Sequence, residues 1–206
     1  MTRAYPIAKR LFDLAAAGVG LIVLAVTMLA IYLLVRLTSR GPGFFRQARA
    51  GAAGRTFTML KFRTMRAEHL HDPDPSVVIT TADADVTKVG AFLRRTKLDE
   101  LPQLLNVIAG QMSLVGPRPT VPEQIAGYDE FQRRRLEAVP GITGLAQING
   151  DTALTWPERI EWDVYYVDHR SFAMDLAILL RTPGVLLRGP NRRVRRLAEV
   201  HPSRRE

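Results

Sequence analysis

One long apolar segment dominates the pattern of hydrophobic and polar positions. From Leu14 to Val35 the chain carries no charged residue, and no helical spacing leaves a polar stripe. About twenty apolar residues are enough for a helix to cross the hydrocarbon core of a bilayer. The segment is too long for the apolar core of a signal peptide, and no cleavage site follows it. We therefore expect a membrane-inserted helix, with a buried core helix as the alternative.

Basic residues lie on both sides of this segment. They are Arg3, Lys9 and Arg10 before it and Arg36, Arg40, Arg46, Arg49 and Arg55 after it. Positive flanks tend to stay on the cytoplasmic side of a membrane, so two positive ends favour a re-entrant helix over a simple crossing. A re-entrant helix needs a kink, and the segment has no proline. Thr27, Gly18 and Gly20 are the weaker candidates for causing one, and a spanning helix stays open.

Shorter patterns after this segment predict a mixed, mostly helical domain. Phe44–Arg49 and Thr56–Phe62 are rich in aromatic and β-branched residues and flank a Gly-Ala-Ala-Gly turn, which predicts a β-hairpin. Apolar residues at helical spacing predict helices over Val89–Arg95, Asp99–Ile108, Glu123–Ala138, Thr155–Tyr166 and Phe172–Leu187. The expected fold is α+β, with a small hairpin, an inserted N-terminal helix, and helices packed on the membrane surface.

The remaining segments have no clear periodicity. Residues 66–88 predict a surface loop, which we favour over a metal site at His69, His71 and Asp72. Residues 113–122 predict an extended connection, and residues 139–150 are rich in turn residues. We expect a membrane-associated helix in residues 1–40, a catalytic domain in 41–188 and a basic tail in 189–206.

The amino-acid composition limits the chemical class of the binding partner. The net charge is +9 and the isoelectric point is about 10.6, which predicts an anionic partner: nucleic acid, anionic lipid or a phosphorylated substrate. The absence of cysteine excludes disulfides and thiolate catalysis. Aromatic residues make up 7% of the chain and do not alternate with Arg or Lys, which argues against nucleic acid.

The segment LRRTKLDELPQL, residues 93–104, is the first candidate for chemistry. We place Asp99 at the N-cap of a helix and Pro102 in its first turn, where the missing N–H is harmless. The helix dipole and the cations before it would favour an ionised carboxylate. Neighbouring helical residues do not face each other, so Asp99 and Glu100 suit different roles. The alternative is a plain cap followed by an acidic first turn.

Two cationic motifs strengthen the case for chemistry. In GPRP, prolines on both sides support Arg118, which suits a bidentate grip on phosphate. In KFRTM, Lys61 and Arg63 would point to the same side of a strand. Each motif has an ordinary structural alternative, but together with a membrane segment they indicate an anionic phosphorylated substrate handled at a bilayer.

Several segments, taken in order, resemble the bacterial sugar transferases, the monotopic phosphoglycosyl transferases. They are KRLFDL, PGFFRQARAG, FTMLKFRTM, TKLDELPQLLNV, GQMSLVGPRP, VPGITGLAQING and DVYYVDHRSFAMDLAILLRT, between residues 9 and 182. The resemblance implies transfer of a sugar 1-phosphate from a UDP-sugar to polyprenol (undecaprenyl) phosphate, with release of UMP, in surface-glycan synthesis. It places the enzyme on the cytoplasmic face of the inner membrane.

The resemblance also implies residue roles. Asp99 would be the nucleophile that forms an aspartyl-phosphosugar, Glu100 its partner, and Mg²⁺ the ion held by both. The substrate-binding candidates are Lys61, Arg63, Arg94, Arg118, Asp163 and Asp175, with the last two acids assigned only by position. A homodimer is a further candidate assembly. The alternative function is a non-catalytic, membrane-anchored basic scaffold, and a tethered nucleic-acid binder is a weaker one.

Four residues, at three places in the chain, depart from the family pattern. Ala25 and Val26 stand where the family usually has the Ser-Pro pair that breaks its re-entrant helix. Leu145 replaces a common tryptophan, and Asp151 replaces a residue that is often basic. The first change leaves the membrane geometry open. The others would affect lipid contact or sugar preference more than the phosphoryl chemistry.

Overall fold

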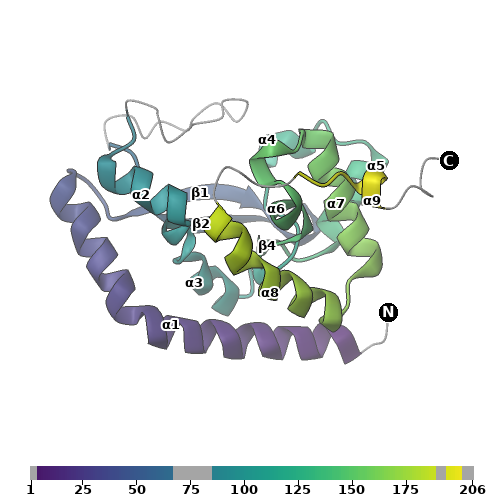
Figure 1. The fold of residues 1–206 in the computed structure, drawn as a ribbon, viewed down its shortest axis with the longest axis horizontal. Coiled ribbons are helices and arrows are strands. Elements are labelled where there is room, and N and C mark those ends of the chain that lie inside the picture. Colours follow the sequence, from purple (N-terminus) through teal and green to yellow (C-terminus); the bar gives the residue numbers. More distant parts are fainter. Residues whose placement is uncertain (1–3, 67–84, 189–193, 201–206) are drawn as a thin grey trace.

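The computed structural model describes residues 4–66, 85–188 and 194–200. Helix α1, Ala4–Thr38, is continuous but bent, and it wraps around one side of the other elements (Figure 1). It is long and apolar enough to cross a membrane, and only 11% of its most apolar window is buried inside the molecule. Its surface makes the buried-core-helix alternative wrong, since Ile22, Val23 and Val26 are 71–80% exposed.

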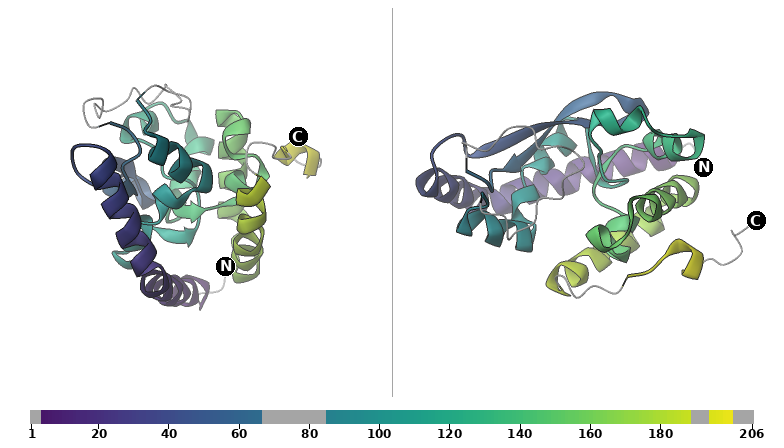
Figure 2. Two further views of the ribbon diagram at one scale, coloured as in Figure 1. Left: turned by 60° about the vertical axis from the view of Figure 1, so that its left-hand side comes forward. Right: turned by 90° about the horizontal axis from the view of Figure 1, so that it is seen from above.

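The bend lets both halves of α1 pack on the same domain. Ala17, Leu21 and Leu24 of the first half join a core cluster with Leu104 and Val107 of α3, Gln103–Ile108. The second half packs against α2, Lys88–Thr96, in another cluster, whose α1 members are Met28, Ile31, Tyr32 and Val35. Figure 2 shows α1 on one side of the α2–α3 region and α8 on the other.

The predicted hairpin is confirmed. Strands β1, Phe44–Ala50, and β2, Thr56–Phe62, pair antiparallel from Phe44 opposite Phe62 to Ala50 opposite Thr56. The turn contains Ala53 and Gly54, both with positive φ (54° and 74°). The Gly-Ala-Ala-Gly segment therefore supplies the backbone conformations that this turn needs.

The predicted helices are confirmed in part. Helix α2 follows the prediction, and α7, Trp156–His169, begins with the predicted capping box of Thr155 and Glu158. Helix α8 covers Phe172–Arg188. The single helix predicted over 123–138 is wrong. Three shorter elements take its place: α4, Pro122–Ile125, α5, Glu130–Arg133, and a 3-10 turn, Arg134–Glu137. The chain begins a new helix at α5 because Asp129 caps it: the Gln132 N–H donates to the Asp129 Oδ1 at 2.8 Å.

A parallel strand pair joins two segments that the sequence left without regular structure. Strand β3, Ser113–Val115, pairs with β4, Gly141–Thr143, and helix α6, Leu145–Asn149, follows directly. The backbones approach so closely that a Cβ on Gly141 would lie 2.0 Å from the Gly116 nitrogen. This pair fixes the start of the Gly-Pro-Arg-Pro segment and thereby positions Arg118.

The main core cluster lies between β3, α6, α7 and α8 and includes Val115, Leu154, Trp162, Tyr166 and Ile178. A short helix near the C-terminus, α9, Leu197–Val200, packs Leu197 into the same cluster. Most of the loop predicted over 66–88, with its two histidines, lies outside the described residues. So does most of the predicted basic tail.

Candidate active site

Asp99 and Glu100 lie in a short 3-10 helix, Leu98–Glu100, between α2 and α3. Both acids are buried, with 6% of each residue exposed. The prediction that Asp99 caps the following helix is wrong, because Pro102 occupies the N-cap position of α3 and no side chain caps that helix. Lys97 adopts a left-handed conformation (φ 58°) just before the acids. The two carboxylates are therefore held by a tight turn rather than by a helix dipole.

Two cations from distant segments hold Glu100. The Lys61 Nζ lies 2.9 Å from its Oε1, and the Arg118 Nη2 lies 2.7 Å from the same oxygen. Burial alone would raise the pKa of Glu100, but Arg118 and Lys61 hold it well below its ordinary range. The structure thus brings together four of the predicted site residues: Lys61, Arg118, Glu100 and the adjacent Asp99.

Asp99 has different surroundings. Its Oδ1 is buried and has no hydrogen-bond partner among the described residues. Burial raises the pKa of Asp99, Lys61 opposes that shift, and the neighbouring charge of Glu100 adds to it. The prediction that the surroundings favour ionisation therefore applies to Glu100 and is wrong for Asp99. One acid is fixed as an anion, while the other keeps an oxygen free and is easier to protonate.

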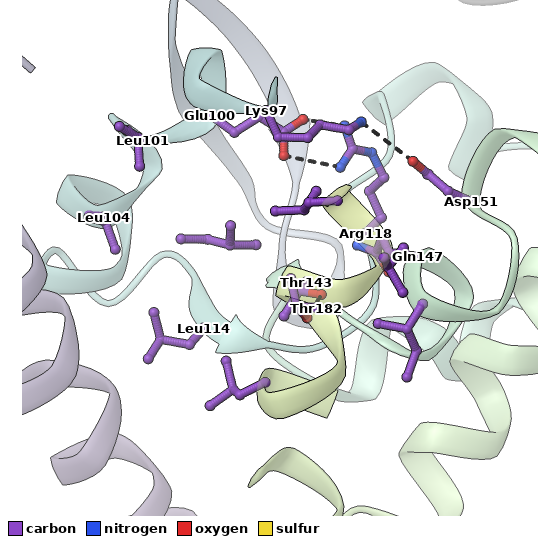
Figure 3. A pocket seen from close by; sticks show the side chains of 15 residues that line it. Lys97, Glu100, Leu101, Leu104, Leu114, Arg118, Thr143, Gln147, Asp151 and Thr182 are labelled. Atoms are coloured by element: carbon purple, nitrogen blue, oxygen red, sulfur yellow. Dashed lines mark hydrogen bonds and ion pairs between the residues drawn. The ribbon is translucent and has the colours of Figure 1, made fainter. Parts of the chain in front are cut away.

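A pocket of about 250 Å³ opens beside Glu100 (Figure 3). Lys97 and Asp151 face each other across it with Nζ and Oδ2 3.4 Å apart, and both have left-handed backbones. Gln147 of α6 lines the same pocket as Arg118. Sequence reasoning did not select Gln147 or Asp151 as site residues, although the acid at 151 was noted as a departure from the family pattern.

Arg63 is not brought to this site. It follows the end of β2 and is only 1% exposed. Its Nη2 donates to the carbonyl oxygen and the hydroxyl of Ser39, at 2.8 and 2.6 Å. We expected Lys61 and Arg63 to point to the same side of a strand, but Arg63 lies beyond the end of the strand and ties the hairpin to the segment after α1. Arg94 donates from Nε to the Thr64 hydroxyl, at 2.8 Å.

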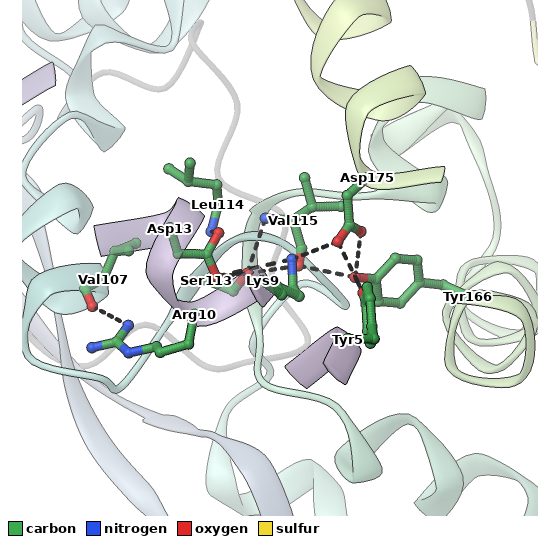
Figure 4. A network of polar contacts seen from close by, with 10 residues as sticks. All are labelled: Tyr5, Lys9, Arg10, Asp13, Val107, Ser113, Leu114, Val115, Tyr166 and Asp175. Atoms are coloured by element: carbon green, nitrogen blue, oxygen red, sulfur yellow. Dashed lines mark hydrogen bonds and ion pairs between the residues drawn. The ribbon is translucent and has the colours of Figure 1, made fainter. Parts of the chain in front are cut away.

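The two acids assigned by position are held in internal networks. Asp163 pairs with Arg135, and both side chains are 2% exposed. Arg135 in turn donates to the Arg118 carbonyl oxygen at 2.9 Å, so Asp163 supports the site from behind. Asp175 accepts from Tyr5 and Lys9 of α1, both at 2.9 Å, and from Tyr166, at 2.7 Å (Figure 4). This second network fastens the beginning of α1 to α8 and α7.

The two adjacent carboxylates suit Mg²⁺ better than a metal ion that takes all of its ligands from the protein. Among the described residues no cluster of three acids or histidines forms a metal site. Mg²⁺ is commonly bound by one or two carboxylates together with substrate phosphates and water. The unpartnered Asp99 Oδ1 and the nearby Glu100 fit that pattern.

Comparison with known proteins decides the family. Residues 4–189 match the bacterial sugar transferase family. The chain belongs to this family. The bacterial sugar transferase is 47% identical over 176 residues to the uncharacterized sugar transferase EpsL of Bacillus subtilis (strain 168), with 85% of each chain covered. It is 41% identical over 194 residues to the exopolysaccharide production protein ExoY of Rhizobium meliloti (strain 1021), covering 87% of this chain and 86% of ExoY.

Other relatives are longer. The chain is 43% identical over 182 residues to a UDP-glucose:undecaprenyl-phosphate glucose-1-phosphate transferase of Klebsiella pneumoniae. That match covers 84% of this bacterial sugar transferase but only 39% of the relative. The family match over residues 4–189 includes the dyad of Asp99 and Glu100, the hairpin and the Gly-Pro-Arg-Pro segment.

Proposed function

We propose that this bacterial sugar transferase moves a sugar 1-phosphate from a UDP-sugar to polyprenyl phosphate, such as undecaprenyl phosphate, and releases UMP. The observation that carries the proposal is the division of roles in the dyad. Glu100 is fixed between Lys61 and Arg118, whereas the Asp99 Oδ1 is buried without a partner. A carboxylate oxygen that accepts no hydrogen bond is available to attack an electrophile.

The reaction consists of two displacements at one phosphorus atom. In the first, an ionised Asp99 oxygen attacks the phosphorus that carries the sugar, the bond from that phosphorus to the bridging oxygen breaks, and UMP leaves with the bridging oxygen. In the second, a phosphate oxygen of the lipid attacks the same phosphorus. The bond to Asp99 then breaks, which gives a polyprenyl diphosphate sugar and frees the carboxylate.

Lys61 and Arg118 support both steps. An anion attacks an anionic diphosphate, so the charge that accumulates must be neutralised by fixed cations. Both cations lie within 2.9 Å of Glu100, and Glu100 in turn fixes their positions beside Asp99. If Mg²⁺ binds, Asp99 and Glu100 would hold it, and it would neutralise the phosphate oxygens further.

We also propose the donor and the location. Relatives named as UDP-glucose:undecaprenyl-phosphate glucose-1-phosphate transferases make UDP-glucose the first donor to test. The exposed apolar surface of α1 supports attachment to the inner membrane, and the basic flanks of its apolar segment support a catalytic domain on the cytoplasmic face. The glycan pathway would then begin with this transfer.

Release of UMP from UDP-sugars, measured with and without polyprenyl phosphate, tests the proposal. Asp99→Asn should reduce turnover at least about a thousandfold, because the amide cannot form the acyl phosphate of the first displacement. The control is Asp168→Asn, which changes an exposed acid on α7 that pairs with Arg134. Full turnover by Asp99→Asn would overturn the role of Asp99. A wild-type protein that releases no UMP from any donor would support a scaffold instead.

A further inference from the structure

The pocket beside the dyad has two chemically different ends (Figure 3). Arg118 and Lys97 form the charged end together with Glu100 and Asp151, and each acid pairs with one of the two cations. The walls away from these charges are aliphatic and come from α3 and the turn before it, the β3–β4 pair and α8; among them are Leu101, Leu104, Leu114, Ile142, Leu179 and Leu186. A ligand that fills the whole pocket must therefore be an amphiphile with a small charged head.

The helices on either side of the pocket also carry apolar side chains on their outer surfaces. On α8, Leu180 is 73% exposed and Leu187 is 89% exposed. On α3, Leu105 and Ile108 are each about two-fifths exposed. Exposed apolar side chains beside a long apolar helix indicate contact with lipid. An apolar chain could thus extend from lipid into the pocket without entering water.

Gln147 marks the boundary between the two ends. The residue is 9% exposed, and both its amide nitrogen and its amide oxygen lack a hydrogen-bond partner among the described residues. Leaving buried polar groups unpaired costs about 1–3 kcal/mol each, so a partner is expected in the working state. Gln147 and Arg118 line the same pocket (Figure 3), so the amide N–H groups and the guanidinium can donate to one bound anion.

We propose that this pocket binds the isoprenoid phosphate acceptor. Arg118, Lys97 and the Gln147 amide receive its phosphate, and the first isoprene units occupy the aliphatic part between α3 and α8. Lys97 exchanges its ion pair with Asp151 for the phosphate. This inference rests on the proposed function and assigns the acceptor to one side of the dyad.

The alternative occupant, the nucleotide sugar, suits the pocket less well. Uracil and sugar hydroxyl groups need several hydrogen-bond partners when they are buried. The aliphatic walls offer none, and the Thr143 and Thr182 hydroxyls already bond to each other at 2.9 Å. The Thr182 hydroxyl also bonds to the Ile178 carbonyl, at 2.8 Å.

Two tryptophan variants on α8 test the aliphatic part. Leu186→Trp places an indole in the pocket, whereas Leu187→Trp adds the same apolar bulk at a neighbouring position that is 89% exposed. Leu186→Trp should raise the KM for polyprenyl phosphate about tenfold or more, relative to the KM for the UDP-sugar. An equal effect of Leu187→Trp, or a rise confined to the KM for the donor, overturns the proposal.

Gln147→Glu tests the polar boundary. It keeps the size of the side chain but places a negative charge where we place the phosphate, so the KM for the acceptor should rise about tenfold or more. The control is Gln111→Glu, at an exposed glutamine whose Oε1 accepts from the Asn106 amide at 2.7 Å and can do so as a carboxylate. An unchanged KM for the acceptor in Gln147→Glu argues that the phosphate lies elsewhere.

Direct binding separates this inference from the proposed function. Farnesyl phosphate, a soluble isoprenoid phosphate, can be titrated into the intact protein in detergent and followed by ³¹P NMR. Binding that Leu186→Trp weakens and Leu187→Trp does not would support the pocket even if the wild type released no UMP. Normal release of UMP together with equal binding to both variants would overturn the pocket and leave the proposed function intact.

Discussion

Asp99 and Glu100 are adjacent in the sequence, yet the fold gives them opposite electrostatics. Glu100 receives both nearby cations, and the pKa of its carboxyl falls. Asp99 is equally buried, has an oxygen without a partner, and its pKa rises. The cause is positional: Lys61 and Arg118 reach the second acid from β2 and from the Gly-Pro-Arg-Pro segment.

This difference gives a pH prediction for Lys61→Met. Asp99 must be ionised to attack, so activity falls as the pH drops through its raised pKa. Among the groups that act on Asp99, Lys61 is the strongest that lowers this pKa. Its removal should therefore move the acidic limb of the pH profile of UMP release to higher pH. Lys88→Met, at an exposed position in α2, is the control. An acidic limb that moves to lower pH would contradict the role of Lys61.

At the scale of elements, a buried ion pair connects the loop that carries Arg118 to α7. Arg135 in the 3-10 turn after α5 pairs with Asp163, with Nη2 and Oδ2 2.5 Å apart, and donates to the hydroxyl of Tyr128 at 2.8 Å. The same guanidinium donates to the Arg118 carbonyl oxygen. Proline residues stiffen the Arg118 segment, but this contact determines where the segment lies.

Arg135→Met should therefore destabilise the protein by about 3–5 kcal/mol, because it leaves Asp163 as a buried, unpaired charge. Chemical denaturation in detergent measures the change in the free energy of unfolding. Arg134→Met, which removes a more exposed neighbouring cation, should cost less than about 1 kcal/mol. An equal decrease in the free energy of unfolding in the two variants would show that the buried ion pair stabilises the protein no more than the exposed one.

The accuracy of the element predictions depended on how local their causes were. The hairpin and the start of α7 were predicted correctly because a turn sequence and a capping box lie within a few residues. The β3–β4 pair was missed because three-residue strands show no periodicity, and their pairing joins residues 113–115 to 141–143. The helix predicted over 123–138 was wrong because the cap at Asp129 outweighs helical spacing.

At the scale of the whole molecule, the bend in α1 determines how the apolar helix is attached to the rest of the protein (Figure 1). Lys9 and Tyr5, near the start of α1, bond to Asp175 of α8, while Ile31 and Val35, near its end, pack against α2 and the hairpin. Both ends of the helix are therefore docked on one domain. We propose that α1 enters and leaves the membrane through the same face, although Ala25 and Val26 lack the breaking proline.

Cysteine labelling tests this topology, because the natural chain contains no cysteine. Cysteines introduced at Ala4 and Arg40, which flank the apolar part of α1, should both resist a membrane-impermeant reagent added to intact cells. Both should react once the inner membrane is opened, which is the matched control. Labelling of Ala4→Cys in intact cells would show that the helix crosses the bilayer.

Features whose causes are local or compositional could be predicted from the residues alone. These are the apolar helix, the hairpin, the capped start of α7, and the choice of Asp99, Glu100, Lys61 and Arg118 as candidates. The partner of each buried charge depends instead on how distant segments pack together. The tertiary structure assigned Lys61 and Arg118 to Glu100 across 39 and 18 positions of sequence. It also moved Arg63, Asp163 and Asp175 into internal contacts and placed Gln147 at the pocket. Such pairings depend on how elements pack around a buried site, and no local spacing encodes them.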